Sequence, residues 1–146
     1  MRNKKNNFDN FVDHVKCYTD GGCRGNPGPG AVGILICDAS NNELDTYSEC
    51  IGHTTNNRAE YVAVIKGLPR CAKFTRRRVT VFCDSQLVIN QMNGSWRLKD
   101  ETLRNLCLEI KNLERLFDAV IYTQVNRNNP FLKKADRLLN EAFEGR

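Results

Sequence analysis

The sequence predicts one α/β domain built on a five-stranded mixed sheet, with three antiparallel strands followed by two parallel ones and helices on both faces. Two observations lead to this prediction. The first half of the chain alternates short apolar runs with clusters of turn-forming residues, which is typical of an antiparallel meander. The second half alternates strand-like runs with segments whose apolar residues recur at helical spacing, which is typical of parallel strands linked by helices.

The apolar runs of the first half predict three strands. A glycine- and proline-rich loop separates the first two, and a run of turn-forming residues separates the second from the third. We expect strands over 15–19, 31–37 and 43–51, the loop over 21–30 and the hairpin turn over 38–42.

In the second half, helix starts are predicted by residues that cap helices. Asn56 and Asn57 predict a helix that runs to about Ala72, and Asp100 predicts a longer one that runs to Phe117. The remaining expected elements are a strand over 76–83, a helix over 85–92, a strand over 119–125, a loop over 126–130 and a helix over 131–143. Residues 1–14 are rich in Asn and Lys, so we expect a flexible N-terminal extension followed by a single domain over 15–146.

Composition excludes several classes of protein. Hydrophobic residues make up 40% of the chain and charged residues 27%, which fits neither a disordered nor a membrane protein, and the first residues do not resemble a secretory signal. Lys and Arg total 22 against 17 acidic residues, and this net charge of +5 modestly favours a polyanionic partner. The seven cysteines include no C-x-x-C pair, so we expect reduced thiols and a cytoplasmic protein.

Two aspartates stand at the predicted carboxyl ends of apolar strands. Asp20 follows the first strand, and Asp84 follows the run Val79–Cys83. A carboxylate in such a place is costly unless something pairs with it, and ligands of open sheets bind at strand ends. If the two strands are parallel neighbours, both carboxylates point into one crevice.

Glu60 and Asp136 are ambiguous when each is considered alone. The spacing Asn57–Glu60 is that of a capping box, so Glu60 is as readily a helix cap as a ligand. Asp136, in the last predicted helix, is better explained locally as a solvated charge. Together, however, the four carboxylates form a set that would repel one another unless divalent cations bind, and all-oxygen ligands favour Mg²⁺ or Mn²⁺.

Four collinear motifs resemble those of ribonucleases H of type 1. They are the runs 18–31 (YTDGGCRGNPGPGA), 54–61 (TTNNRAEY), 83–88 (CDSQLV) and, more loosely, 129–138 (NPFLKKADRL). The resemblance implies a ribonuclease H-like fold and an endoribonuclease that cuts the RNA strand of RNA–DNA hybrids with two divalent ions, leaving 5′-phosphate and 3′-hydroxyl ends.

The resemblance also implies a role for each carboxylate. Asp20 would bridge both metal ions, and Asp136 would help to hold the ion that activates the attacking water. Glu60 and Asp84 would hold the ion at the leaving 3′ oxygen, and Glu60 would also approach the ribose 2′-hydroxyl.

The implied substrate contacts lie in the first three motifs. Contacts in the minor groove are needed because RNA differs from DNA by its 2′-hydroxyl. Residues 23–26 would lie on the RNA strand, largely through their main chain, and Asn56 and Gln86 would touch bases or sugars. The full expected set is Gly22, Cys23, Arg24, Gly25, Asn26, Asn56, Asn57 and Gln86.

The chain departs from the family in two places. The loop before the last aspartate, 126–130, lacks the histidine that many members carry, and Arg127 or Asn128 is the candidate substitute. The lysine-rich helix that some members use as a basic handle is also missing, so we expect weaker hybrid binding with a shallower salt dependence. Trp96, Arg97 and Lys99 are candidates to compensate in part, although packing under the loop is the better explanation for Trp96.

Other functions are less well supported. A catalytically silent hybrid-binding or scaffold domain of the same fold would usually have lost a carboxylate, and all four are present. An integrase or resolvase would share the fold and metals but not Asn26, Asn56 and Gln86. We expect a monomer with no obligatory protein partner and no membrane attachment.

Overall fold

The structure, a computed structural model, describes residues 11–94 and 99–145. It confirms the predicted mixed sheet, whose strand order is β3-β2-β1-β4-β5. The β1–β2 and β2–β3 pairs are antiparallel, and the β1–β4 and β4–β5 pairs are parallel. The strands are β1 (His14–Cys23), β2 (Gly28–Asp38), β3 (Glu43–Thr54), β4 (Arg78–Cys83) and β5 (Ala119–Gln124).

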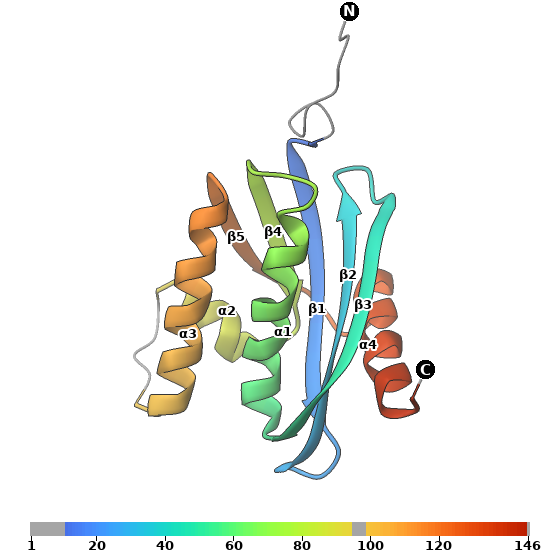
Figure 1. The fold of residues 1–146 in the computed structure, drawn as a ribbon, viewed down its shortest axis with the longest axis vertical. Coiled ribbons are helices and arrows are strands. Elements are labelled where there is room, and N and C mark those ends of the chain that lie inside the picture. Colours follow the sequence, from blue (N-terminus) through green and yellow to red (C-terminus); the bar gives the residue numbers. More distant parts are fainter. Residues whose placement is uncertain (1–10, 95–98, 146) are drawn as a thin grey trace, which may run out of the picture.

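Helices cover both faces of this sheet (Figure 1). They are α1 (Asn56–Cys71), α2 (Gln86–Met92), α3 (Glu101–Leu113) and α4 (Pro130–Phe143). α1 and α3 lie on one face, and α4 lies on the other against β1, β2 and β3. α3 is shorter than predicted, because a 3-10 turn, Glu114–Leu116, replaces its last turn.

Alternation along the strands builds two cores. Val15 and Cys17 of β1 point into the larger core under α1 and α3. Tyr18 points to the opposite face, into a smaller core with Leu132 and Ala135 of α4. Every second residue of β1 therefore faces α4, including Asp20.

The predicted loop 21–30 is largely strand. Cys23 pairs with Gly30 and Gly22 with Ala31, so only residues 24–27 lie outside β1 and β2. The glycines serve close packing more than chain reversal, because a Cβ on Gly30 would lie 2.4 Å from Thr54 Cγ2. A glycine-rich composition is thus a poor guide to loop length here.

The start of the predicted extension and Trp96 and Arg97 lie outside the described residues, so the domain boundary stays a prediction. The described part of that extension is tied down, since the Val12 N–H donates to the Phe74 carbonyl at 2.8 Å. α2 ends at Met92 and α3 begins at Glu101, which leaves only residues 93–100 to connect them.

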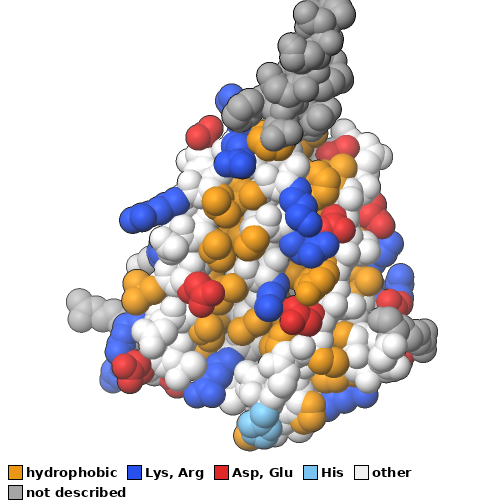
Figure 2. All heavy atoms as spheres, in the orientation of Figure 1, with side chains coloured by type: hydrophobic (Ala, Val, Ile, Leu, Met, Phe, Trp, Pro, Cys, Tyr) orange, Lys and Arg blue, Asp and Glu red, His pale blue; other side chains and the backbone are white. Residues whose placement is uncertain are grey.

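The charged surface and the free cysteines are those expected from the composition. Figure 2 shows the α1 and α3 face, where charged side chains of both signs lie among hydrophobic ones. Among the described residues, no helix combines the length and the apolar character needed to cross a membrane. All seven cysteines are free thiols.

Candidate active site

Asp20 and Asp84 lie side by side, as their strands predicted. Tyr18 and Phe82 are register partners in the parallel β1–β4 pair. Asp20 follows Tyr18 by two residues, and Asp84 follows Phe82 by two residues. One detail of the prediction was wrong, because β1 continues past Asp20 to Cys23. Asp20 is therefore a buried residue within the strand and not at its end.

Glu60 reaches this pair from the α1 face. A Cβ on Gly21 would lie 2.1 Å from the carbonyl oxygen of Ala59, so only glycine lets α1 approach β1 so closely. The capping-box explanation for Glu60 is wrong, because Thr55 is the cap and accepts a hydrogen bond from the Arg58 N–H at 3.2 Å. Glu60 stands more than one turn into the helix, beyond the unpaired N–H groups that a cap would serve.

Asp136 reaches the same place from the opposite face. Gly33 is the register partner of Asp20 on β2, and a Cβ there would lie 2.0 Å from the carbonyl oxygen of Ala135. α4 therefore crosses the sheet in contact with Gly33, and the next residue of the helix is Asp136. The solvated-charge explanation does not fit Asp136, since its side chain is only partly exposed, lines the groove with Asp20 and raises the pKa of Asp20.

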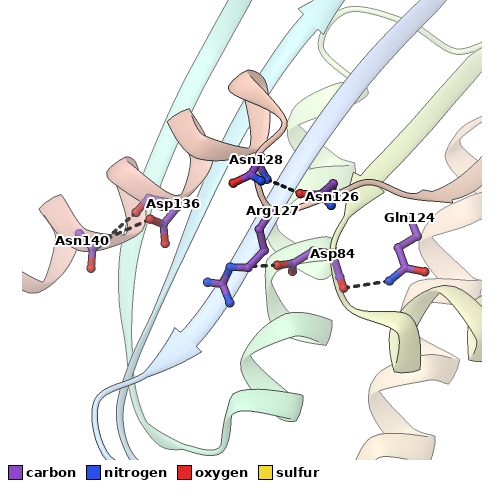
Figure 3. Close-up of polar contacts among 7 residues, drawn as sticks. All are labelled: Asp84, Gln124, Asn126, Arg127, Asn128, Asp136 and Asn140. Carbon is purple, nitrogen blue, oxygen red and sulfur yellow. Dashed lines mark hydrogen bonds and ion pairs between the residues drawn. The ribbon is translucent and has the colours of Figure 1, made fainter.

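The four carboxylates line one groove of about 600 Å³. Asp20, Glu60 and Asp84 each offer an oxygen within 4.8 Å of the other two. Figure 3 shows Asp84 from the end of β4 and Asp136 from α4, with the side chain of Arg127 extending between them. The Nε of Arg127 lies 3.5 Å from Asp84 Oδ2.

Burial and mutual repulsion raise the pKa of two of these groups. Burial is the largest cause of the raised pKa of Asp20, which reaches about 8, followed by the hydrogen bond and charge of Asp136 and the charge of Asp84. The pKa of Glu60 is raised well above its usual value, first by burial and then by the charges of Asp20 and Asp84. The charge of Arg127 opposes both shifts.

The residues present fit a divalent cation. The buried Oε1 of Glu60 has no hydrogen-bond partner within the described part of the chain. Such an atom is costly unless a ligand satisfies it, and the surrounding donor set consists of carboxylate oxygens. The arrangement can therefore hold hard cations and present them to an anionic ligand in the groove.

Amides join the two segments next to the carboxylates. Asn56 Oδ1 accepts from the Cys23 N–H at 2.9 Å, and Asn26 Oδ1 accepts from the Asn56 N–H at 3.1 Å. The Cys23 thiol lies 3.4 Å from Asn56 Oδ1 and 3.6 Å from Asn26 Oδ1. Because these bonds use the amide oxygens, the NH₂ groups of Asn26 and Asn56 are left to donate to a ligand.

Most of the expected substrate contacts line the same groove, namely Gly22, Cys23, Arg24, Asn56, Asn57 and Gln86. Asn26 instead lines an adjoining hollow with Thr55 and Arg58. Gly25 lies in the turn between β1 and β2, with a φ of 75° that favours glycine.

The loop before α4 places Arg127 and Asn128 beside the carboxylates. Both line a smaller hollow with Asp20, Asp84 and Asp136. The Asn128 N–H donates to Asn126 Oδ1 at 2.8 Å, which folds the loop back on itself. Arg127 is the one of the two with an ion pair to a carboxylate of the cluster.

Sequence reasoning missed three groove residues on α4, Leu139, Asn140 and Phe143. Asn140 Nδ2 donates to the Asp136 carbonyl at 3.0 Å and lies 3.5 Å from Asp136 Oδ2 (Figure 3). A usable signal was present, because these residues follow Asp136 at spacings of three, four and seven, which place them on one helix face.

Comparisons with known proteins agree with this geometry. The family described as "Reverse transcriptase-like" matches residues 18–142. Ribonuclease HI of Halobacterium salinarum is 38% identical over 130 residues, which cover 89% of this chain and 64% of the relative. Mycobacterial relatives of similar identity are longer, and the chain spans 35% of their length.

Two solved structures are similar over almost their full length. The crystal structure of RNase H1 from Halobacterium salinarum has a TM-score of 0.86 and 37% identity, with 91% of this chain and 99% of that chain covered. LC11-RNase H1 in complex with an RNA/DNA hybrid has a TM-score of 0.83 and 35% identity, with 90% and 97% covered.

Proposed function

The chain belongs to the ribonuclease H family of type 1, and we propose that it hydrolyses the RNA strand of RNA–DNA hybrids. The observation that carries the proposal is the convergence of Asp20, Glu60 and Asp84, with Asp136 beside them, in a groove that is also lined by amide donors. An all-oxygen cluster next to hydrogen-bond donors suits a phosphodiester more than a carbonyl substrate.

The carboxylates would share the work of holding two divalent ions, Mg²⁺ or Mn²⁺. Ions held there supply Lewis-acid stabilisation of the phosphoryl group during attack by water. Asp20 would be common to both ions, Asp136 would serve the side of the attacking water, and Glu60 and Asp84 the side of the leaving 3′ oxygen. Attack in this sense leaves a 5′-phosphate and a 3′-hydroxyl.

The amide side of the groove would select the hybrid. The Nδ2 groups of Asn26 and Asn56 are held by the hydrogen bonds of their oxygens, so they can donate to acceptors in the minor groove or to a 2′-hydroxyl. Gln86 and Asn57 would extend this surface, and the main chain of residues 23–26 would follow the RNA strand.

Arg127 is the better candidate for the role of the missing loop histidine. Its guanidinium lies beside Asp84, whereas the contact of Asn128 with Asn126 Oδ1 is made by its main-chain N–H and not by its side chain. Arginine does not lose its proton at neutral pH, so Arg127 would act by binding the phosphate or the leaving product and not by proton transfer.

Two further properties complete the proposal. Seven free thiols, most of them buried, suit a reducing compartment such as the cytoplasm. We also propose that residues 15–146 act as a monomer, because the carboxylates and the amides all come from one chain.

The decisive experiment is cleavage of a labelled RNA–DNA hybrid in Mg²⁺ or Mn²⁺, with duplex DNA and duplex RNA as comparison substrates. We expect only the RNA strand of the hybrid to be cut, with no cutting in chelator or by Asp20→Asn. Asp118→Asn is the matched control, since Asp118 is exposed and lies outside the groove. Hybrid binding without cutting under either ion would favour the alternative, a catalytically silent hybrid-binding or scaffold domain.

A further inference from the structure

One wall of the groove combines the β1–β2 loop with the end of α4. Arg24 is the first residue after β1, and Phe143 is the last residue of α4. The Cζ of Arg24 lies 4.3 Å from the centroid of the Phe143 ring, and both side chains line the groove that holds Asp20 and Asp136. The sequence motifs assign the segment around Arg24 to the substrate through its main chain and assign nothing to Phe143.

The backbone of Arg24 is fixed although its side chain is exposed. Its N–H donates to the Pro29 carbonyl at 2.9 Å, which closes the turn between β1 and β2. The turn is tight, because a Cβ on Gly28 would lie 2.1 Å from the Arg24 carbonyl oxygen. The guanidinium is therefore carried by a well-defined Cα and is restrained at its far end by the ring of Phe143.

The end of α4 is fixed as well. The Cys50 thiol donates to the Ala142 carbonyl at 3.2 Å, which ties the last turn of the helix to β3. Leu139, one turn earlier, is buried beside Gly22, where an added Cβ would meet its Cδ1 at 4.0 Å. The half-buried ring of Phe143 thus projects into the groove from a helix end held on two sides.

The ring contact prepares the guanidinium for a phosphate. The guanidinium lies over the ring, a contact that uses none of its N–H groups as donors to an oxygen, so they stay available. These donors match two oxygens of one phosphate, and the restraint reduces the entropy lost on binding. The groove concentrates negative charge at Asp20, Glu60 and Asp84, and Arg127 stands beside Asp84. Arg24 therefore adds a second cation for a polyanionic strand, on the opposite wall of β1 and α4.

We propose that Arg24 binds a backbone phosphate of the RNA strand at a subsite of its own, and that Phe143 is the positioning residue that aims it. The inference rests on the proposed function, because it takes the RNA strand to follow residues 23–26 toward the carboxylates. The subsite would replace one of the phosphate contacts that other members obtain from a basic handle.

The first test is the salt dependence of hybrid binding, measured by anisotropy in an Asp20→Asn background. Arg24→Ala should weaken binding by about five- to tenfold near 0.1 M salt and lower the log–log salt slope by about one. Lys111→Ala removes an equal charge from an exposed position on α3 and should change neither quantity. An unchanged slope in Arg24→Ala would overturn the proposal.

The second test separates positioning from packing. Phe143→Leu keeps an apolar side chain and should lose most of the affinity that Arg24→Ala loses, whereas Phe143→Tyr should restore it. In the double variant Arg24→Ala/Phe143→Leu, the Phe143 change should add nothing, because its partner is gone. Full additivity of the two changes would contradict a positioning role.

The third test locates the phosphate. Hybrids with a single neutral methylphosphonate at successive positions of the RNA strand should include one that weakens binding to the parent chain but not to Arg24→Ala. Sensitivity of both proteins at every position would reject the subsite. Cutting of the hybrid by the unaltered chain is scored separately, so failure of this subsite and failure of the proposed function give different results.

Discussion

Glu60 and Asp136 reach the same buried aspartate from opposite faces of the sheet, and the two faces hold them differently. α1 approaches β1 at Gly21 over the larger core, and Glu60 is left with a buried oxygen that lacks a partner in the described chain. α4 crosses β2 at Gly33 over the smaller core, and its Asp136 is half-buried beside the amide of Asn140. One carboxylate is thus fixed by backbone packing, and the other is also restrained by a neighbouring side chain.

The difference teaches how a fold can concentrate negative charge. In each helix, an alanine packs against a strand glycine, and the residue after that alanine enters the cluster. Ala59 packs on Gly21 and precedes Glu60. Ala135 packs on Gly33 and precedes Asp136. The unfavourable charge is greatest for the two most buried groups, Asp20 and Glu60, whose pKa values are raised. We therefore expect substitutions at the α1–β1 contact to cost more stability and activity than substitutions at the α4–β2 contact.

The largest effect should follow a methyl group at the two glycines. Gly21→Ala and Gly33→Ala each drive a Cβ into a helix carbonyl, and overpacking of this kind destabilises by about 1–3 kcal/mol. Moving a carboxylate by about 1 Å should also lower kcat about a hundredfold. We expect Gly21→Ala to lose more stability than Gly33→Ala, because α1 is confined by α3 as well as by the sheet.

Urea unfolding and hybrid cleavage measure the two quantities on the same samples. Gly52→Ala provides a control, because its φ of 82° strains an alanine although nothing lies within 4 Å of the added Cβ. It should lose some stability and keep its activity. Equal stability losses at Gly21 and Gly33 would break the comparison between the two faces.

The next effect concerns pH in the absence of divalent ions. A carboxyl whose pKa is higher in the folded than in the unfolded chain favours the folded state while it is protonated. For Asp20 this contribution is present below about pH 4 and is lost as the pH rises toward about 8. The loss corresponds to about 1.4 kcal/mol for each unit by which the pKa is raised, and Glu60 adds a loss of the same sign.

Thermal or urea unfolding between pH 4 and 8 in chelator checks this expectation. Asp20→Asn should flatten the decline with pH, whereas Asp118→Asn should reproduce the parent curve. Added Mg²⁺ or Mn²⁺ should restore stability most near pH 8, where the cluster is most fully charged. A parent chain that is more stable at pH 8 than at pH 5 in chelator would contradict the raised pKa values.

A smaller effect is expected from Arg127. Its charge lowers the pKa of both Asp20 and Glu60, so Arg127→Ala should raise both values further and shift the pH profile of the apparent Mg²⁺ affinity toward alkaline pH. We expect kcat near neutral pH to fall about tenfold, the size of a modest electrostatic contribution. Lys133→Ala is the control, because Lys133 lines the same hollow without an ion pair to the cluster among the described residues. Equal profiles for Arg127→Ala and Lys133→Ala would remove Arg127 as the substitute for the histidine.

The residues of the site could be predicted from the sequence more reliably than the packing contacts that bring them together. Asp20 and Asp84 were predicted from local pattern, because a carboxylate after an apolar strand is unusual in itself. Local pattern left Glu60 open between a cap and a ligand and favoured a solvated charge for Asp136, since what makes both part of the cluster is a contact with the sheet. That contact depends on Gly21 and Gly33, and nothing in the order of residues couples Gly33 to Ala135.

The fold was predicted in outline and differed at its edges. The mixed sheet of three antiparallel and two parallel strands, with helices on both faces, was predicted from alternation and helical spacing, which are local properties. The strand order β3-β2-β1-β4-β5 was not predicted, because it depends on contacts between segments far apart in the sequence. The extent of β1 and β2 was wrong, because glycines that read as a loop serve close packing in the sheet. The α4 residues of the groove were missed for a different reason. Their spacing from Asp136 was visible, but its meaning depends on which helix face meets the groove.

The smallest effect tests how the α4 side holds its carboxylate. Asn140→Ala removes the amide that contacts both the carbonyl and the Oδ2 of Asp136, and it leaves the packing of Leu139 in place. The carboxyl of Asp136 should become less restrained, so kcat should fall about three- to tenfold while KM changes little. The apparent affinity for Mn²⁺, measured by calorimetry, should weaken to a similar degree, which a merely structural role would not produce. Asn140→Gln keeps the amide and should recover part of the loss. Glu60 is held by the backbone contact at Gly21, so we expect no substitution of a neighbouring side chain to affect Glu60 as selectively. If an Asn140 variant were as active as the parent, both carboxylates would be positioned by backbone packing alone.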